Sequence, residues 1–204
     1  MTTVSERISI IVFAVVILGW IVFTAVFLAR KKPPKAPERK RDRASIAGIV
    51  IQGFGFAIVW AVRRPFFTPI ATDNLALNIS LAIVTVALVV GSLWMIITAV
   101  RVLGKQWSFA ARLIEEHELV KEGPYHIVRH PIYTGMFGML IATALALSHW
   151  IGLIIGIVVF MVGTSMRVRS EEKLLRDAFG RAYEEYAQQV PAVVPLSRGV
   201  RSSR

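Results

Sequence analysis

Four long stretches of this chain of 204 residues contain no formally charged residue, and this pattern limits the possible folds more than any other feature. The uncharged stretches cover residues 8–29, 44–62, 75–100 and 131–166. A helix of about 20 apolar residues is needed to cross a bilayer core of about 30 Å. The first three stretches have about this length, so we expect each to form one membrane-spanning helix.

The fourth stretch is too long for one crossing, because a helix over residues 131–166 would extend roughly 54 Å at ~1.5 Å per residue. Two spans, at 131–148 and 150–166, joined by a tight turn near Trp150 fit better. The sequence therefore predicts a single all-α integral membrane domain over residues 1–204 with about five transmembrane helices. A cleaved signal peptide is the alternative for residues 8–29. A retained span is favoured because the stretch exceeds the ~7–15 apolar residues of a signal sequence.

The positive charge of the chain indicates how these helices are oriented. The net charge is +11, and the linker 30–43 is basic and interrupted by prolines. By the positive-inside rule this linker is cytoplasmic, which places the N-terminus outside and the C-terminus in the cytoplasm. Basic segments between apolar stretches favour contact with anionic lipid headgroups, and no nucleic-acid motif accompanies them, so we expect no nucleic-acid partner.

Small residues interrupt the second apolar stretch at Gly48, Gly53 and Gly55. Such residues allow the backbones of membrane helices to approach closely. We therefore expect this helix to pack tightly against a neighbour.

Two polar segments, 103–130 and 167–195, are too charged to cross a membrane and are expected on the cytoplasmic side. In the second, charged residues alternate at helical spacing with Leu174, Leu175 and Phe179. This pattern predicts an amphipathic helix that continues from the last span and breaks near Gly180. Its charged face would return toward the segment before residue 131, so we expect a functional site where the two segments meet.

Arg167 and Glu171 are the first candidates for chemistry, because residues four apart share one face of a helix. A surface salt bridge is the ordinary interpretation of such a pair. Arg167, however, lies where the apolar stretch ends, and a charge at that depth is costly unless it has a partner or a function.

The Arg129-His130-Pro131 sequence has two interpretations. In the first, Arg129 anchors to lipid headgroups and His130-Pro131 begins a helix. In the second, His130 and the first N–H groups of that helix bind an anion such as a carboxylate, with Tyr125 and Tyr133 beside a flat ring. The four histidines lack the spacing of metal ligands, so we expect no metal. The absence of cysteine excludes a thiolate site or a cysteine nucleophile.

Several of these motifs in combination resemble the isoprenylcysteine carboxyl methyltransferase family. The resemblance covers about residues 107–195 and rests on HELV at 117–120, GPY at 123–125, RHPIY at 129–133, Arg167 with Glu171 and Glu172, and FGRAYEEY at 179–186. Membrane phospholipid N-methyltransferases and some sterol reductases have a related C-terminal region. The resemblance implies methyl transfer from S-adenosylmethionine at the cytoplasmic membrane face.

The resemblance also assigns roles to residues. Glu171 would close a cofactor pocket completed by the C-terminal helical segment, with Glu172 left as the alternative carboxylate, and Arg167 would hold the carboxylate of the acceptor. The other pocket residues would be His117, Glu118, Leu119, Val120, Tyr125, His130, Pro131, Ile132 and Tyr133.

The expected reaction is esterification of a lipid-tailed, isoprenylcysteine-like or other hydrophobic acid that enters from the bilayer. A carboxylate is already ionised near pH 7, so attack on a methyl group needs alignment and exclusion of water rather than a strong base. The alternatives are a methyltransferase acting on phospholipid or small amines, and a membrane scaffold or transporter subunit without enzymatic activity.

Overall fold

A computed structural model describes residues 3–29, 40–41, 44–68, 74–104, 112–113 and 118–195 of the chain. His117, one of the expected pocket residues, lies outside these ranges. The described residues form six α-helices, a 3-10 turn at Gly123–His126 and one pair of two-residue strands, so the expected all-α architecture is confirmed. The helices are α1 (Val4–Leu28), α2 (Ala44–Ala61), α3 (Leu75–Leu103), α4 (Pro131–Leu147), α5 (Trp150–Phe179) and α6 (Arg181–Gln189).

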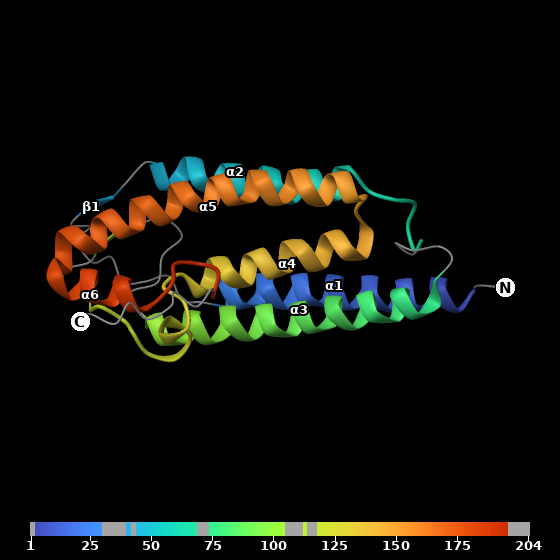
Figure 1. Cartoon of the computed structure of the whole chain (residues 1–204), viewed down its shortest axis with the longest axis horizontal. Helices are drawn as coiled ribbons and strands as arrows, with labels where there is room; N and C mark the ends of the chain where they lie inside the picture. The colour runs from blue at the N-terminus through green and yellow to red at the C-terminus, as the bar shows by residue number, and fades with distance from the viewer. Residues whose placement is uncertain are drawn as a thin grey trace, which may run out of the picture.

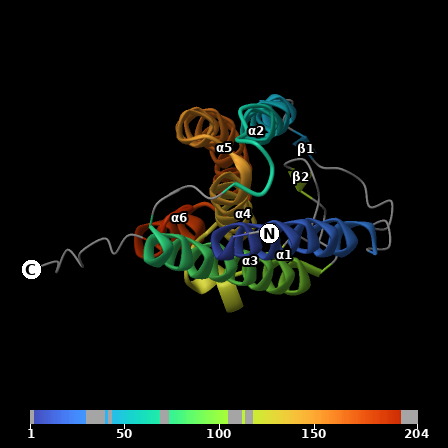
Figure 2. The same cartoon turned by 90° about the vertical axis from the view of Figure 1, so that its right-hand side faces the viewer.

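The helices are arranged in two pairs with α4 between them. Viewed along the bundle, α2 and α5 lie side by side on one side of α4, and α1 and α3 lie on the other (Figure 2). The strands β1 (Lys40–Arg41) and β2 (Arg112–Leu113) pair antiparallel, and they lie at the same end of the bundle as α6 (Figure 1).

The helices have the character of a membrane protein. Among the described residues, α1, α3 and α5 are long and apolar enough to cross a bilayer, while α2 and α4 are apolar but shorter. Large apolar side chains on several helices are exposed, as expected for surfaces that face lipid. They include Ile11, Leu18, Phe54, Ile83, Val90, Val158 and Val162.

Helix α5 extends well beyond its apolar part. It continues without a break from Trp150 to Phe179 and ends at Gly180, whose φ of +49° is a conformation that favours glycine. The predicted continuation of the last apolar helix and its end near Gly180 are therefore confirmed. The charged extension of α5, residues 167–179, projects past the apolar bundle toward α6.

Close approach between α2 and α5 depends on particular glycines. A Cβ atom on Gly48 would lie 2.8 Å from the Gly163 carbonyl oxygen, and one on Gly55 would lie 3.0 Å from that of Gly156. Gly53 differs, because a Cβ atom there would meet nothing within 4 Å. The expectation of tight packing is thus confirmed for Gly48 and Gly55 and wrong for Gly53, whose position on the helix turns it away from α5.

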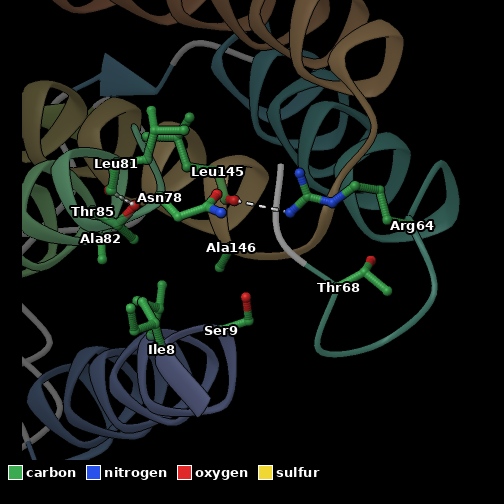
Figure 3. Close-up of a pocket in the computed structure, with 11 residues that line it drawn as sticks. Ile8, Ser9, Arg64, Thr68, Asn78, Leu81, Ala82, Thr85, Leu145 and Ala146 are labelled. Carbon is green, nitrogen blue, oxygen red and sulfur yellow. Dashed lines mark hydrogen bonds between the residues drawn. The ribbon is translucent and has the colours of Figure 1, made fainter. Parts of the chain in front are cut away.

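At the end of the bundle opposite to α6, Arg64 joins the α2–α3 connection to the end of α4. Its backbone N–H donates to the Leu147 carbonyl at 2.9 Å, and its Nη2 donates to the Leu145 carbonyl at 3.0 Å. A cation at a helix C-terminus is favourable because the last carbonyls carry partial negative charge. A small recess lies beside this contact, with Ser9 and Asn78 on its wall (Figure 3).

Candidate active site

The start of α4 and the charged extension of α5 meet around His130. The His130 Nδ1 atom lies 3.2 Å from Glu171 Oε2, and its Nε2 atom lies 3.4 Å from Glu172 Oε1. His130 is the residue before α4, and Pro131 is the first residue of that helix, where a missing backbone N–H costs nothing. The structure thus brings together the two segments that the sequence placed on the same side of the membrane.

The charges of this group follow from its contacts, and His130 and Glu172 both lie outside the apolar segments. Burial lowers the pKa of His130, but hydrogen bonds and charge interactions with Glu171 and Glu172 outweigh burial and raise the pKa above its ordinary value of 6.5. Burial raises the pKa of Glu172, but His130 and Arg129 outweigh it and lower the pKa to about 2. At neutral pH Glu172 is therefore an anion, and His130 holds its proton to higher pH than a free histidine.

Arg129 connects this group to the end of the chain. Its Nη2 atom lies 2.6 Å from Glu172 Oε1, and its Nη1 donates to the Ala187 carbonyl at 2.8 Å and also to that of Val190. The Arg129 side chain is 7% exposed. The interpretation of Arg129 as a lipid-headgroup anchor is therefore wrong, because its guanidinium is directed into the protein.

A short segment after α6, residues 190–193, runs along the start of α4 as a C-terminal strap. The backbone N–H groups of Arg129 and His130 donate to the carbonyls of Pro191 and Ala192, both at 2.9 Å. The Thr134 hydroxyl donates to the Val193 carbonyl at 2.5 Å. The strap therefore fixes the backbone that carries His130.

Arg167 approaches the same group from the beginning of the α5 extension. Its Nη2 atom lies 3.8 Å from Glu171 Oε1, and its Cζ lies 4.6 Å from the centre of the Tyr133 ring. The Tyr133 hydroxyl donates to Glu171, and the Tyr133 and His130 rings are stacked with an interplanar angle of 11°. These contacts connect six side chains into one charged cluster, which consists of Arg129, His130, Tyr133, Arg167, Glu171 and Glu172.

Exposure within the charged cluster is uneven. The Glu171 side chain is 24% exposed, whereas those of Arg167, His130 and Glu172 are between 5% and 9% exposed. A ligand that approaches these four residues therefore meets Glu171 most readily.

The other expected pocket residues lie either near Tyr186 of α6 or at the start of α4. Tyr125 is buried, and its carbonyl accepts a hydrogen bond from the Tyr186 hydroxyl at 2.6 Å. Leu119 packs against Tyr186 in the same region, while Glu118 is exposed and Val120 half-buried. Pro131 is buried at the start of α4. Ile132 packs against the buried pair of Ile96 and Val100 of α3.

Two polar residues near Arg167, Gln52 and Thr164, were not predicted from the sequence. The Gln52 Oε1 atom of α2 accepts from Arg167 Nη1 at 3.0 Å, and its Nε2 donates to the Thr164 hydroxyl at 2.8 Å. An unpaired buried amide is costly, and hydrogen bonds between membrane helices contribute about 0.6–2 kcal/mol. The available signal in the sequence was a single glutamine within an uncharged stretch, and it did not identify the partner.

The charged cluster lies within a region that matches a known family. A model of the family described as phospholipid methyltransferase matches residues 81–182, which is half of the chain. The chain belongs to the phospholipid methyltransferase family. The match extends from α3 to the start of α6, so it contains the charged cluster but not Gln52.

This member of the phospholipid methyltransferase family is similar to several protein-S-isoprenylcysteine O-methyltransferases. The Arabidopsis thaliana protein-S-isoprenylcysteine O-methyltransferase B is 38% identical over 101 residues, which are 48% of this chain and 51% of the relative. The Schizosaccharomyces pombe enzyme is 34% identical over 87 residues, 43% of this chain and 37% of the relative. The Saccharomyces cerevisiae enzyme is 41% identical over 81 residues, 40% of this chain and 34% of the relative. The match thus covers about half or less of each relative, and the resemblance inferred from the sequence motifs is confirmed.

Proposed function

We propose that this protein transfers a methyl group from S-adenosylmethionine to the carboxylate of an isoprenylcysteine-like or other lipid-tailed acid, giving a methyl ester. The observation that carries the proposal is the position of Arg167. It lies where α5 changes from apolar to charged, against Tyr133 and Glu171. A carboxylate attached to a lipid tail would reach this depth, and the names of the relatives agree with such an acceptor.

The residues present fit S-adenosylmethionine, which would supply a methyl group on a positively charged sulfur. The partly exposed Glu171 carboxylate complements a positive charge, and His130, whose pKa is raised, can donate to an anionic group. Glu171, with residues 117–120, Tyr125 and residues 130–133, would hold the cofactor.

In this mechanism the protein binds and aligns rather than moving protons. Arg167 would bind the acceptor carboxylate through its planar guanidinium, and Glu171 and Tyr133 would keep that guanidinium in place. A carboxylate is ionised near pH 7, so no strong general base is needed. Burial of Arg167 and His130 would exclude water from the nucleophile, which strengthens the attraction between charges there.

We also propose that α1–α5 all cross the membrane, with the N-terminus outside and the charged cluster at the cytoplasmic face. Helices α2 and α4 have 18 and 17 residues. Their lengths of roughly 27 and 26 Å are slightly below the thickness of a typical bilayer core, a mismatch that local thinning accommodates. The basic linker 30–43 would then contact anionic headgroups of the inner leaflet. The lipid tail of the acceptor would approach sideways, between helices.

The test is a methyl-transfer assay on the detergent-solubilised protein with radiolabelled S-adenosylmethionine and an S-farnesyl cysteine acceptor. We expect calorimetric binding of the cofactor and transfer of label into a product that mild alkali hydrolyses to methanol. Folded protein that neither binds the cofactor nor transfers label would contradict the proposal and favour a scaffold or transporter subunit.

A second candidate is methylation of an amine in a phospholipid headgroup, which the description of the matching family favours. An amine acceptor must lose a proton, so it would gain from a base, and the cation at Arg167 would repel an ammonium group. Label that stays on the product after alkali would identify this reaction, because a methylamine is not hydrolysed.

A further inference from the structure

Gln52 is a fully buried amide on the face of α2 that packs against α5. It is 2% exposed, and both ends of its amide are used by α5: Thr164 accepts from Nε2, and Arg167 donates to Oε1. Thr164 and Arg167 are three residues apart, so they lie on the same face of α5. One side chain of α2 thus connects the hydrophobic part of α5 to the first residue of its charged extension.

One turn earlier, Gly48 makes room for the same arginine. A Cβ atom on Gly48 would lie 2.5 Å from Arg167 Cγ. The missing side chain lets the Arg167 stem lie against the α2 backbone, and Gln52 then binds the guanidinium at its end. Helix α2 therefore determines both the path of the Arg167 side chain and the position of its guanidinium. Helix α2 itself lies outside the part of the chain that matches the family.

We infer that Gln52 is a positioning residue that orients the Arg167 guanidinium toward the carboxylate of the acceptor. The inference rests on the proposed esterification, in which Arg167 binds that carboxylate. The Gln52 hydrogen bond is 3.0 Å long, whereas Arg167 Nη2 lies 3.8 Å from Glu171, so the glutamine constrains direction more tightly than the ion pair does. A guanidinium must present two parallel N–H groups to bind a carboxylate bidentately, and this requires a defined plane.

The experiment compares Gln52→Leu, which removes both amide contacts, with Thr164→Val, which removes only the contact within the apolar bundle. Ser165→Ala is the neutral control, because the Ser165 side chain is exposed and its hydroxyl donates to Met161 of its own helix. For Gln52→Leu we expect kcat/KM for the acceptor to fall by about 10- to 100-fold, as for a lost hydrogen bond to a charged group. Binding of S-adenosylmethionine should stay within about twofold of the wild type, and Thr164→Val should lose much less activity.

Two outcomes of this assay overturn the inference. Equal losses in Gln52→Leu and Thr164→Val would mean that Gln52 only joins the two helices. A Gln52→Leu protein with wild-type kcat/KM would mean that Arg167 is oriented without it.

If the wild type makes no ester, the proposed function fails, and the positioning of Arg167 is then measured without turnover. Protein labelled with nitrogen-15 arginine, with the Arg167 signals assigned by Arg167→Lys, reports rotation of the guanidinium. Separate Nη signals in the wild type that merge in Gln52→Leu would support the inference, and identical signals in both proteins would overturn it.

Discussion

The neighbouring carboxylates Glu171 and Glu172 have different surroundings although they are adjacent in the chain. Glu172 is 9% exposed and binds Arg129 and Arg176 as well as His130. Glu171 is more exposed and binds Tyr133, His130 and Arg167. These surroundings favour Glu171 as the carboxylate that meets a ligand and Glu172 as the one that holds the structure together. The sequence alone left this choice open, because adjacent helical positions differ by only about 100° around the axis.

Removal of the Arg129 side chain should destabilise the protein strongly. In Arg129→Ala, Glu172 loses its closest cation, and the carbonyls of Ala187 and Val190 lose their donor. Breaking a buried pair costs about 3–5 kcal/mol, and we expect the lower end because Arg176 still binds Glu172. Thermal unfolding in detergent, followed by circular dichroism, measures the change.

The control is Arg181→Ala, which breaks an ion pair on the surface. Its two residues are four apart in the chain, as Glu172 and Arg176 are. Arg181 Nε lies 2.9 Å from Glu185 Oε1, but the two side chains are 91% and 57% exposed. Exposed pairs contribute about 0–1 kcal/mol, so the unfolding temperature should barely change. Similar losses in both variants would contradict the structural role of Arg129.

The stability of the protein should depend on the protonation of His130. Its pKa is raised in the folded state, so its contribution is complete below the unfolded pKa of about 6.5 and is lost as the pH rises through the folded pKa. The pKa of Glu172 is lowered to about 2, so its contribution is present above about 4.5 and is lost as the pH falls toward 2. We therefore expect His130 and Glu172 together to contribute most to the free energy of unfolding between about pH 4.5 and 6.5. Denaturant unfolding from pH 5 to 9 should show that the free energy of unfolding of the wild type falls as the pH rises, and that this fall is smaller in His130→Gln. Equal falls in the two proteins would contradict the role of His130.

Among the helices, those of the apolar part followed directly from the sequence, because uncharged stretches of sufficient length leave few alternatives to a helix. Their boundaries differ by a few residues, since α1 begins at Val4 and α3 ends at Leu103. The β1–β2 pair was not foreseen, because two-residue strands carry no periodicity that a sequence can display. The contacts of Arg129 and Gln52 also escaped prediction. A sequence shows that a cation or an amide borders an apolar segment, but which partner it meets depends on how distant helices pack.

The α2–α5 contact offers a clean test of helix packing. Gly48→Ala should destabilise the protein by about 1–3 kcal/mol, because the added methyl group would lie 2.8 Å from the Gly163 carbonyl oxygen, a backbone atom that cannot turn away. Gly53→Ala, on the same helix, adds the same methyl group where it meets nothing within 4 Å. It should be neutral or stabilising by up to about 1 kcal/mol, from helix propensity alone. Thermal unfolding of the two variants compares them, and equal destabilisation would show that α2 and α5 do not pack as described.

For the molecule as a whole, the two ends of the helix bundle differ in chemistry. Helix α6 and the start of α4 lie at one end of the bundle, and the end of α4 lies at the other (Figure 1). The charged cluster and the C-terminal strap are built around the start of α4, whereas Arg64 binds the carbonyls at its end. The proposed transfer of a methyl group from a water-soluble cofactor to a lipid-tailed acceptor needs polar groups at the membrane surface, and this difference between the two ends agrees with that proposal. The five crossings that we propose would place the two termini on opposite sides of the membrane.

The absence of cysteine makes this topology directly measurable, because any introduced thiol can be labelled without background. Arg63 forms a β-bridge with Ser148 just after the end of α4, Glu185 lies on α6, and both are exposed. In spheroplasts with the outer face of the membrane exposed, Arg63→Cys should react with a membrane-impermeant maleimide, whereas Glu185→Cys should react only after permeabilisation. The positive-inside rule predicts this order, since β1, which belongs to the basic segment between α1 and α2, lies at the α6 end (Figure 1). The opposite pattern would invert the topology and move the charged cluster away from the cytosolic cofactor, while labelling of both from outside would exclude five crossings.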